Sequence, residues 1–526
     1  MDESALRWPD EGLPEGSVTE GASLNADVDE AFDFVVVGSG AAGAVAAHTL
    51  VTAGHSVAIV EEGPWVKTRD FGVDVYGAFR SMMRDAGMQV LSGRSFIPML
   101  QGRCVGGSTA VNSAIAWRIP EDVIDDWSHR FGLGDTLTMA GLEPHFDALE
   151  RDLHVQTPEP GALGRNSELF IEQTRRSGIE SAPMRRYDAG CKGSSRCLTG
   201  CPNGAKQGMN VTYVPWALSR GARMFTSCRV LEVKSRNGAA VAVLAETVTD
   251  GVPGARKHSV LLRARRGVVV AASTVQTPVI LRRSGIRGRE VGAHFQAHPG
   301  VAIGGVFDES IDMHVGATQG AESIHFRKTD RFKLETINMQ PELAAARIPG
   351  VGSSLLDRLA ELGHVAVWAA QVRADAEGTV RPGLGGASRV SYSPSVADMH
   401  VARKALVTIG HLLFDAGARE IWPGIFGLPD VLRSRDEVKL IADGPTDPRC
   451  YGFIASHLFG AARMGPDPRS SVVGKDFATH ALQRLFVVDS SVFPTNLGVN
   501  PQHSIMAISR FAATRLAAAP PVRIAA

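Results

Sequence analysis

The sequence predicts an α/β protein in which a Rossmann-like sheet is assembled from separate segments of the chain. Three strand-to-helix joints support this prediction, each consisting of an apolar strand followed by a turn of small residues. They lie within residues 34–52, 266–286 and 485–501, far apart along the sequence. Because a doubly wound sheet gathers such joints at one edge of its parallel strands, the three segments are expected to meet in space.

The first joint, FDFVVVGSGAAGAVAAHTLV, carries a GxGxxG motif between its strand and its helix. Gly38 permits a tight turn, Gly40 lets a pyrophosphate approach the backbone, and Gly43 lets the helix pack closely on the strand. Glu61 closes the next strand, 18 residues after Gly43, where a carboxylate can accept hydrogen bonds from ribose hydroxyls. With Ser39 between the first two glycines, these residues predict a dinucleotide site, although the motif alone does not separate NAD from FAD.

A second glycine-rich loop, GRCVGGSTAVNSAIAWR, follows at residues 102–118. Its glycines, Gly106 and Gly107, would let backbone amides lie against a flat ring, because they carry no side chains to keep it away. Ser108 comes next, and Asn112 adds a side-chain donor. On its own this segment is also compatible with an ordinary glycine turn.

The other two joints lie in the middle and at the end of the chain. Residues 266–286 read as a buried strand, a small-residue turn and a helix, and LFVVDSSVFP is a strand that ends in Asp489. In the following TNLGVNPQHS, Asn500 and Pro501 are typical of a helix start, since Asn is a favoured N-cap and Pro is favoured at the first helical position. His503 lies three residues after Asn500, on nearly the same helix face.

Composition restricts the class of protein. Lys and Arg balance Asp and Glu at 55 residues each, so no basic surface indicates a nucleic-acid partner. Residues 1–31 are acidic, rich in Pro and Gly, and lack the apolar core of a signal peptide, so we expect a mobile tail. Glycines interrupt the most apolar stretch, residues 34–60. No membrane span is therefore expected, and we expect a cytoplasmic protein.

The order of the motifs resembles that of the glucose–methanol–choline (GMC) flavoprotein oxidoreductases, from about Phe32 to the C-terminus. The matching pieces are VVVGSGAAGAVAA with EEG, GRCVGGSTAVN, AASTVQTPVILRRSGI, VGAHFQAHP, SHLFGAARMG and FVVDSSVFPTNLGVNP. RCLTGCPNGAKQGMNVTYVPWALSRGA and the GVNP ending are most similar to the branch of long-chain alcohol oxidases and cholesterol oxidase. The resemblance implies FAD as the cofactor and a GMC fold, in which an antiparallel-sheet substrate-binding domain covers the flavin.

The resemblance also implies two discontinuous domains and two tails. The FAD-binding domain would comprise residues 32–119, 210–299 and 451–516, the substrate-binding domain residues 120–209 and 300–450, and the tails residues 1–31 and 517–526. No internal repeat or low-complexity block interrupts this arrangement.

Individual cofactor contacts follow from the same resemblance. It implies that the ADP half of FAD is bound by Gly38, Ser39, Gly40, Gly43 and Glu61, that the isoalloxazine lies beside Gly106, Gly107, Ser108 and Asn112, and that Asp489 and Pro501 contact the cofactor. Relatives with covalently bound flavin carry a His in the loop after the two glycines, where this chain has Thr109, Ala110 and Val111. Non-covalent, dissociable FAD is therefore expected.

His457, in SHLFGAARMG, matches the family's catalytic His, and Asn500 matches its partner position. A neutral imidazole is a suitable base for an alcohol hydroxyl because its pKa lies near the working pH. We expect His457 to take the hydroxyl proton while a hydride passes to flavin N5, with the Asn500 amide donating to the same oxygen. The products would be an aldehyde or ketone, with O₂ or another group as electron acceptor, and His503 would be a supporting or bystander residue.

Other interpretations are compatible with the sequence. A sugar or glycoside hydroxyl, including that of a natural product, is an alternative substrate, and a flavin-binding electron carrier or scaffold without turnover is an alternative of another class. Cys191, Cys197 and Cys201 are spaced closely enough for an iron–sulfur cluster, or they are thiols that pack in a buried loop. The sequence does not specify the substrate or the oligomeric state.

Overall fold

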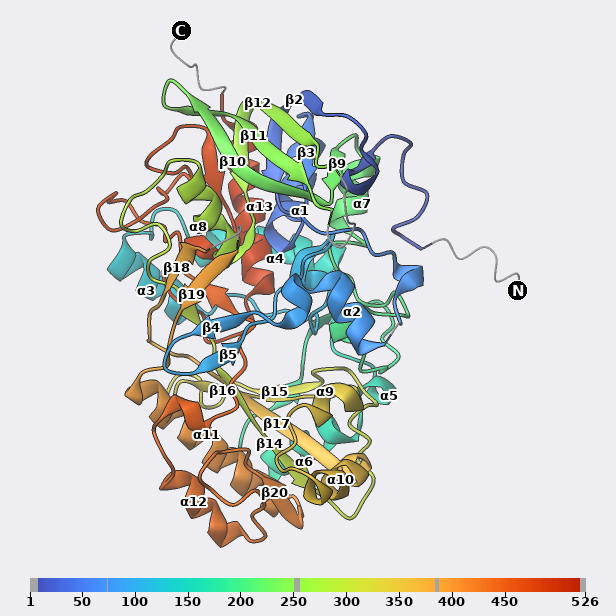
Figure 1. The fold of residues 1–526 in the computed structure, drawn as a ribbon. Helices are drawn as coiled ribbons and strands as arrows, with labels where there is room; N and C mark the ends of the chain where they lie inside the picture. Colours follow the sequence, from blue (N-terminus) through green and yellow to red (C-terminus); the bar gives the residue numbers. More distant parts are fainter. Residues whose placement is uncertain (1–7, 73, 250–255, 384–386, 521–526) are drawn as a thin grey trace.

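The computed structural model describes residues 8–72, 74–249, 256–383 and 387–520. Residues 1–7 and 521–526 of the two predicted tails lie outside these ranges. Two large sheets lie at opposite ends of an elongated molecule, with shorter strands between them (Figure 1). This arrangement confirms the predicted α/β class with a second, antiparallel sheet.

The larger sheet, at the top of Figure 1, contains all three predicted strand-to-helix joints. Its described strands follow the order β1–β9–β3–β2–β12–β11–β10, and β22 pairs with β12. Their bounds are β1 Val18–Glu20, β2 Val28–Val37, β3 Val57–Val60, β9 Arg223–Thr226, β10 Cys228–Arg236, β11 Ala239–Thr247, β12 Ser259–Val270 and β22 Leu485–Val487. β2 pairs in parallel with β3 and β12, and β12 with β22, whereas β10, β11 and β12 form an antiparallel extension.

The beginning of the chain differs from the prediction. Val18–Glu20 forms β1, which pairs in parallel with β9, and β2 begins at Val28 rather than near residue 34. Residues 18–20 and 28–31 therefore belong to the sheet instead of a mobile tail. The acidic, apparently tail-like residues of β2 remain exposed or half-buried while their backbone pairs with β12, so main-chain hydrogen bonds rather than apolar side chains hold this segment.

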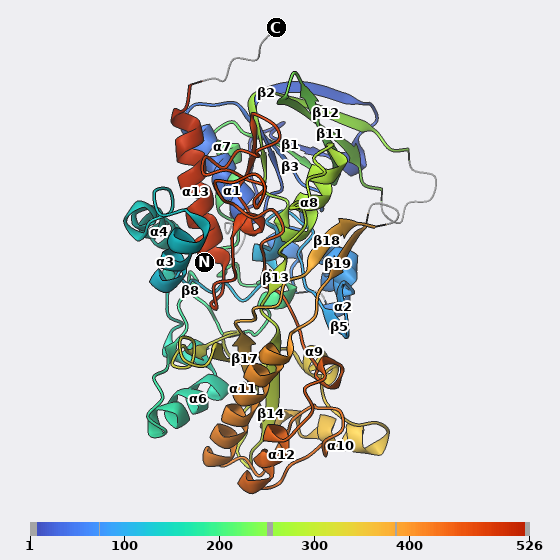
Figure 2. The same ribbon diagram turned by 90° about the vertical axis from the view of Figure 1, so that its left-hand side faces the viewer.

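The second sheet, at the bottom of Figure 1, follows the order β20–β14–β17–β16–β15–β7, and its neighbouring strands pair antiparallel. Its strands are β7 Ala182–Pro183, β14 Gly300–Val306, β15 Ala321–Ser323, β16 Phe332–Thr336, β17 Val365–Val372 and β20 Glu420–Trp422. The long helix α11, Val396–Asp415, packs along β14 and β17 (Figure 2). Apolar side chains of α11 and of these strands form one core.

Helices flank both sheets and connect them. α1 packs between the large sheet, α7 and α13, and α8 packs against β10. The helices other than α11 are α1 Ala41–Thr52, α2 Val75–Met82, α3 Glu121–Phe131, α4 Met139–Asp152, α5 Pro160–Leu163, α6 Arg165–Arg176, α7 Tyr213–Ser219, α8 Ser273–Arg283, α9 Pro341–Ala345, α10 Ser353–Ala360, α12 Lys439–Ala442 and α13 Gln502–Ala518. The remaining strands are β4 Val90–Ser92, β5 Phe96–Pro98, β6 Val155–Gln156, β8 Arg186–Tyr187, β13 Gln296–Ala297, β18 Thr379–Pro382, β19 Ser388–Ser391 and β21 Leu458–Phe459.

Candidate active site

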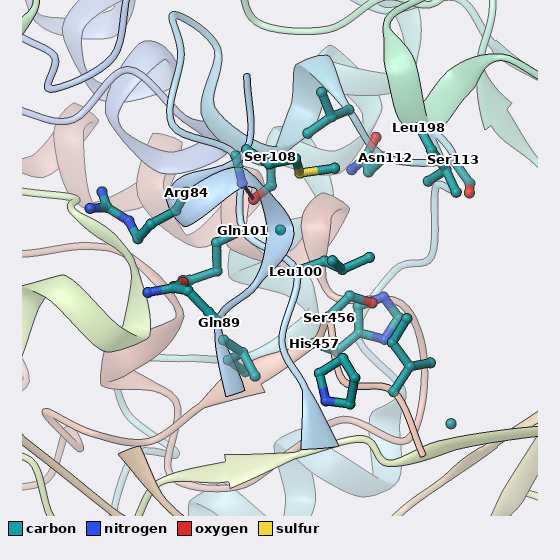
Figure 3. Close-up of a pocket in the computed structure, with 18 of the residues that line it drawn as sticks. Arg84, Gln89, Leu100, Gln101, Ser108, Asn112, Ser113, Leu198, Ser456 and His457 are labelled. Carbon is teal, nitrogen blue, oxygen red and sulfur yellow. Dashed lines mark hydrogen bonds between the residues drawn. The ribbon is translucent and has the colours of Figure 1, made fainter. Parts of the chain in front are cut away.

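A cavity of about 960 Å³ extends from the glycine-rich turn of the large sheet to the antiparallel sheet. Its wall includes the first turn of α1, the loop after residue 106, the segment around His457, and residues of β14, β16 and β17. The three predicted joints and the predicted catalytic pair thus line one continuous space, part of which is shown in Figure 3. A space of this size is large for a small-molecule site and suits a dinucleotide cofactor together with a substrate.

The GxGxxG turn is shaped by close backbone contacts. Gly38 adopts a φ of +98°, and a Cβ there would collide with the Ala271 carbonyl at the end of β12. A Cβ on Gly43 would collide with the Gly38 carbonyl. Among the described residues, a Cβ on Gly40 would meet only Gly107, at 3.9 Å, so Gly40 faces open space in the cavity. Because Gly40, the N-cap residue of α1, has no side chain to cap the helix, the first amides of α1 are available to a phosphate.

Glu61 lies at the end of β3, is buried, and lines the cavity. Its Oε2 accepts hydrogen bonds from the Ser39 backbone (3.0 Å) and the Ser39 hydroxyl (2.7 Å), and its Oε1 accepts one from the Gly63 amide (2.9 Å). Burial raises the pKa of Glu61 despite these donors. The Ser39 hydroxyl also accepts from the Gly106 amide, so Ser39 joins the two glycine-rich loops instead of lining the cavity.

The second loop presents Gly107 and Ser108 to the cavity, whereas Gly106 packs its backbone against Asn210. Asn112 also lines the cavity, but its Nδ2 donates to Gln502 Oε1 (2.5 Å) and its Oδ1 accepts from the Ala114 amide. Both ends of the Asn112 amide are therefore hydrogen-bonded within the protein, which limits its predicted role as a donor to the cofactor.

Two glutamines that the sequence did not single out face the same region. Gln89 and Gln101 line the cavity beside Ser108, and their Oε1 atoms are buried without a hydrogen-bond partner among the described residues (Figure 3). Buried amide oxygens are normally paired, so these two indicate a missing polar ligand. Together with the uncapped α1 and the open space at Gly40, they fit a bound FAD.

Asp489 connects two of the joints. Its Oδ2 accepts hydrogen bonds from the Ser273 amide (3.1 Å) and the Thr277 hydroxyl (2.5 Å) at the start of α8, and its Oδ1 accepts from the Ser491 amide (2.8 Å). The carboxylate is buried, which raises its pKa, and it lines the cavity. Asp489 thus holds α8 against the end of β22, within reach of a ligand in the cavity.

His457 is half-buried, and the cavity lies beside its ring (Figure 3). Its Nδ1 lies 3.3 Å from Nδ1 of His298, a buried residue that has no predicted role although it lies in the piece VGAHFQAHP. Burial lowers the pKa of His457 to about 4, against the opposing influence of the Glu335 carboxylate. The pKa of His298 is also lowered, by burial and by His457. Both rings are therefore neutral at pH 7.

The tautomer of His457 depends on that of His298, because in a hydrogen bond between their Nδ1 atoms one atom carries the proton and the other accepts it. His298 Nε2 lies 3.1 Å from Asn496 Oδ1, and the Asn496 Nδ2 donates to two other oxygens, which fixes Oδ1 as an acceptor. This contact favours a proton on His298 Nε2, a tautomer in which His457 Nδ1 donates to His298 and His457 Nε2 is unprotonated. The Gly498 amide, 3.0 Å from His298 Nε2, favours the opposite tautomer.

Asn500 and Pro501 both line the cavity directly before α13. The helix begins at Gln502 with Pro501 as its N-cap residue, one position later than the Asn–Pro pattern predicts. The Asn500 side chain does not cap the helix because its Oδ1 accepts a hydrogen bond from buried Lys333 (2.6 Å). His503 is fully buried, its Nε2 lies 3.3 Å from Glu150 Oε1, and it does not line the cavity.

The part of the cavity within the antiparallel-sheet region is mainly apolar. Its lining includes Met339, Leu343, Ile348, Val365, Trp422 and Ile425. Gln319, Arg347 and Gln371 add polar groups at separate points. Such a surface favours an apolar ligand, since transferring apolar groups out of water is favourable by about 25 cal/mol per Å².

The cysteine segment lies behind the second glycine-rich loop. Cys197 and Cys201 are buried and Cys191 is half-buried, and Arg186 donates to Cys197 Sγ (3.3 Å). Burial opposes ionisation of Cys197, but the cations of Arg186 and Lys206 outweigh it and lower the pKa of this thiol. Among the described residues, no group of three or more His, Cys, Asp or Glu side chains could hold a metal ion.

The described helices include none that combines the length and the apolar character needed to cross a bilayer. Comparison with known families finds GMC oxidoreductases over most of the chain: the N-terminal family model matches residues 32–300, and the C-terminal model matches residues 377–509.

Three relatives illustrate the range of similar proteins. An uncharacterised GMC-type oxidoreductase of Mycobacterium tuberculosis is 33% identical over 502 residues, covering 95% of this chain and 78% of the relative. A long-chain-alcohol oxidase of Arabidopsis thaliana is 26% identical over 517 residues, covering 93% and 69%. Paromamine 6'-oxidase of Streptomyces fradiae is 25% identical over 528 residues, covering 91% and 90%.

Solved structures share the fold. Pyridoxine 4-oxidase from Mesorbium loti has a TM-score of 0.69 at 18% identity, with 91% of this chain and 98% of that chain covered. A formate oxidase variant of Aspergillus oryzae has a TM-score of 0.70 at 16% identity, with 93% and 99% covered. At these identities the similarity establishes the architecture alone.

Proposed function

This chain belongs to the GMC oxidoreductase family, and from that premise we propose that it carries out the FAD-dependent oxidation of an alcohol with an apolar remainder. Members of the family bind FAD and oxidise alcohol-type substrates, so the chain is an oxidoreductase acting on CH–OH donors. The observation that carries the proposal is the continuous cavity, in which the glycine-rich turn, His457 and an apolar compartment follow one another.

The residues that would hold FAD are distributed along one end of this cavity. The turn at Gly38 and Gly40 with the first amides of α1 would bind the pyrophosphate, and Glu61 would accept from the ribose. Further contacts would come from Gly107, Ser108, Gln89, Gln101, Asp489 and Pro501, with Asn112 limited by its bond to Gln502. Ser39, Gly43 and Gly106 would support the site from behind. When bound, FAD supplies the acceptor for the hydride that leaves the carbinol carbon.

The flavin is proposed to be dissociable, because Thr109, Ala110 and Val111 occupy the loop where covalently flavinylated relatives carry His. Acid precipitation of the purified protein should release the yellow colour into the supernatant. Colour that stays with the precipitated chain would contradict this part of the proposal.

His457 would act as the base that takes the hydroxyl proton. Its low pKa keeps the ring neutral at pH 7, and the His298 tautomer favoured by Asn496 leaves His457 Nε2 free to accept. Once protonated, His457 carries a charge that the buried Glu335 carboxylate stabilises and that the Lys333 ammonium opposes. Asn500 would donate from Nδ2 to the same substrate oxygen and hold it in line during proton transfer.

The apolar compartment favours an aliphatic or ring alcohol over a free sugar. A sugar hydroxyl would bring several other hydroxyls into a region lined by Leu343, Val365 and Trp422, where they would lose hydrogen bonds to water. Relatives named long-chain-alcohol oxidase agree with this preference, whereas the relative named paromamine 6'-oxidase represents the sugar-containing alternative.

An anaerobic screen tests the proposal. Holoprotein would be mixed with primary alcohols of increasing chain length, with a ring alcohol and with glycosides, and flavin bleaching would be followed by absorbance. We expect bleaching by alcohols, with an apparent affinity that rises about tenfold for every two buried methylene groups, at about 0.8 kcal/mol per group. Faster reduction by glycosides would favour the sugar alternative, and no bleaching by any CH–OH donor would support an electron carrier or scaffold. Subsequent addition of air or a dye would identify the electron acceptor.

A further inference from the structure

A buried ionic cluster lies behind Asn500, on the antiparallel sheet. Lys333 and Glu335 alternate on β16 with one residue between them, so their side chains project from the same face of the strand. Glu322 on β15 pairs directly with Glu335. Lys333 is fully shielded from solvent, and the two glutamates are 7% and 2% exposed, so this is an interior cluster rather than a surface ion pair.

The three N–H donors of the Lys333 ammonium each have one acceptor. Lys333 Nζ contacts Glu322 Oε2, Glu335 Oε1 at 2.7 Å and Asn500 Oδ1 at 2.6 Å. An ammonium group has three donors and no acceptor, so the set is complete. Glu322 is itself held by a further hydrogen bond, which Trp117 Nε1 donates to it (2.6 Å).

The hydrogen bond from Lys333 Nζ to Asn500 Oδ1 determines which end of the Asn500 amide faces the cavity. Either end of an Asn amide can face a partner that both donates and accepts, but Lys333 only donates, so the Asn500 oxygen must face it. The Nδ2 group then points away from the cluster. Asn500 lines the cavity, and its Nδ2 has no hydrogen-bond partner in the part of the chain that the structure describes.

The cluster is costly to bury, which argues for a role beyond packing. Removing charged groups from water costs several kcal/mol per ion, and apolar side chains of similar size often stabilise a core better. Burial works against the charge on Lys333, but Glu322 and Glu335 outweigh it and raise the pKa of the lysine, so the ammonium persists. Lys333 lowers the pKa of Glu335 against the effect of burial.

We infer that Lys333 is a positioning residue: it fixes the Asn500 amide so that Nδ2 is aimed into the cavity as a donor to the substrate oxygen. The inference rests on the proposed alcohol oxidation. Without Lys333, the amide can rotate and present its oxygen to the substrate hydroxyl, which makes Asn500 an acceptor that competes with His457 for the proton. The glutamates serve to keep Lys333 charged and in place.

A double-mutant cycle tests this role. We expect Lys333→Met to slow anaerobic flavin reduction by about tenfold to a hundredfold, as for one lost hydrogen bond to a charged group. In an Asn500→Ala background the same substitution should add less than about twofold, because the amide that Lys333 orients is gone. Lys404→Met, at an exposed ion pair with Asp330, is the matched control and should leave the rate unchanged.

A binding measurement separates orientation from general damage. The absorbance of FAD would report the affinity of the oxidised holoprotein for an aliphatic aldehyde. This affinity should fall in Lys333→Met. In the Asn500→Ala background, adding Lys333→Met should not lower it further. Because Lys333→Met leaves two buried carboxylates without a cation, Lys333→Met/Glu322→Gln keeps the net charge of the cluster and serves if the single variant does not fold. Equal effects of removing Lys333 with and without Asn500, or no effect, would overturn the inference. A wild-type flavin that no alcohol reduces would overturn the proposed function instead.

Discussion

The two ends of the cavity are built by different means. At the dinucleotide end, backbone groups of contiguous segments form the surface: the turn at Gly38 and Gly40, the uncapped α1, and the loop at Gly107. At the substrate end, side chains from distant segments meet, among them His298, His457 and Asn500. The dinucleotide end therefore depends on a few glycines that have no side chain, whereas the substrate end depends on charged groups and protons that tertiary packing positions.

The largest effect is expected from a substitution that disrupts the dinucleotide end of the cavity. A Cβ on Gly43 would overlap the Gly38 carbonyl, so Gly43→Val should separate α1 from β2 and yield no folded protein loaded with FAD. Flavin absorbance and thermal unfolding of the purified variant measure this outcome. Gly161→Ala is the control, since a Cβ there meets no atom of the described part of the chain within 4 Å, and this variant should fold and load normally. A Gly43→Val protein with normal FAD content would show that close helix–strand packing is unnecessary.

A more selective change separates folding from cofactor binding at the same end. In Gly40→Ala the new methyl group would meet only Gly107, at 3.9 Å, among the residues that the structure describes, so the variant should fold, but the methyl group would keep a pyrophosphate from the backbone. We expect the Kd for FAD to rise by about tenfold to a hundredfold, the equivalent of one lost hydrogen bond to a charged ligand. Fluorescence titration of apoprotein with FAD gives the value. An unchanged Kd with an unchanged unfolding temperature would place the pyrophosphate elsewhere.

The smallest expected effect concerns pH at the substrate end. Since burial lowers the pKa of His457 to about 4, the neutral base predominates above that pH, and protonation removes it as the pH falls through 4. The rate constant of flavin reduction should therefore vary by less than about twofold between pH 6 and pH 8. Stopped-flow measurements across this range provide the test. A rise of about fourfold or more between pH 6 and pH 8 would mean that the base titrates near its ordinary pKa, and it would contradict the lowered pKa of His457.

The same contrast explains what the sequence could predict. The glycine motifs and Glu61 occur as local patterns whose spacing follows from backbone geometry, so their positions at the cavity were foreseeable. Asn500–Pro501 was foreseeable as a helix start but not as the partner of Lys333, because the local pattern contains no information about a strand 167 residues away.

At the substrate end, local sequence patterns predict the burial of some residues wrongly. β16, FKLET, alternates apolar and polar residues, which is typical of a strand with one face in water, yet all five residues are buried. Lys333 and Glu335 are tolerated there because they neutralise each other and because Glu322 and Asn500 complete the hydrogen bonds. The tail prediction was wrong for residues 18–20 and 28–31 for a related reason: β-pairing of the backbone overrides an acidic composition.

The central claim is that the substrate end removes a hydroxyl proton through His457, and one comparison tests it most directly. Wild-type protein and His457→Ala, both loaded with FAD, would be mixed anaerobically with a saturating aliphatic alcohol while flavin absorbance is recorded. Because general-base catalysis contributes about 10²–10⁴-fold, we predict that reduction slows by that factor while the Kd for FAD stays within about twofold. Reduction at the wild-type rate in His457→Ala would contradict the assignment of the base.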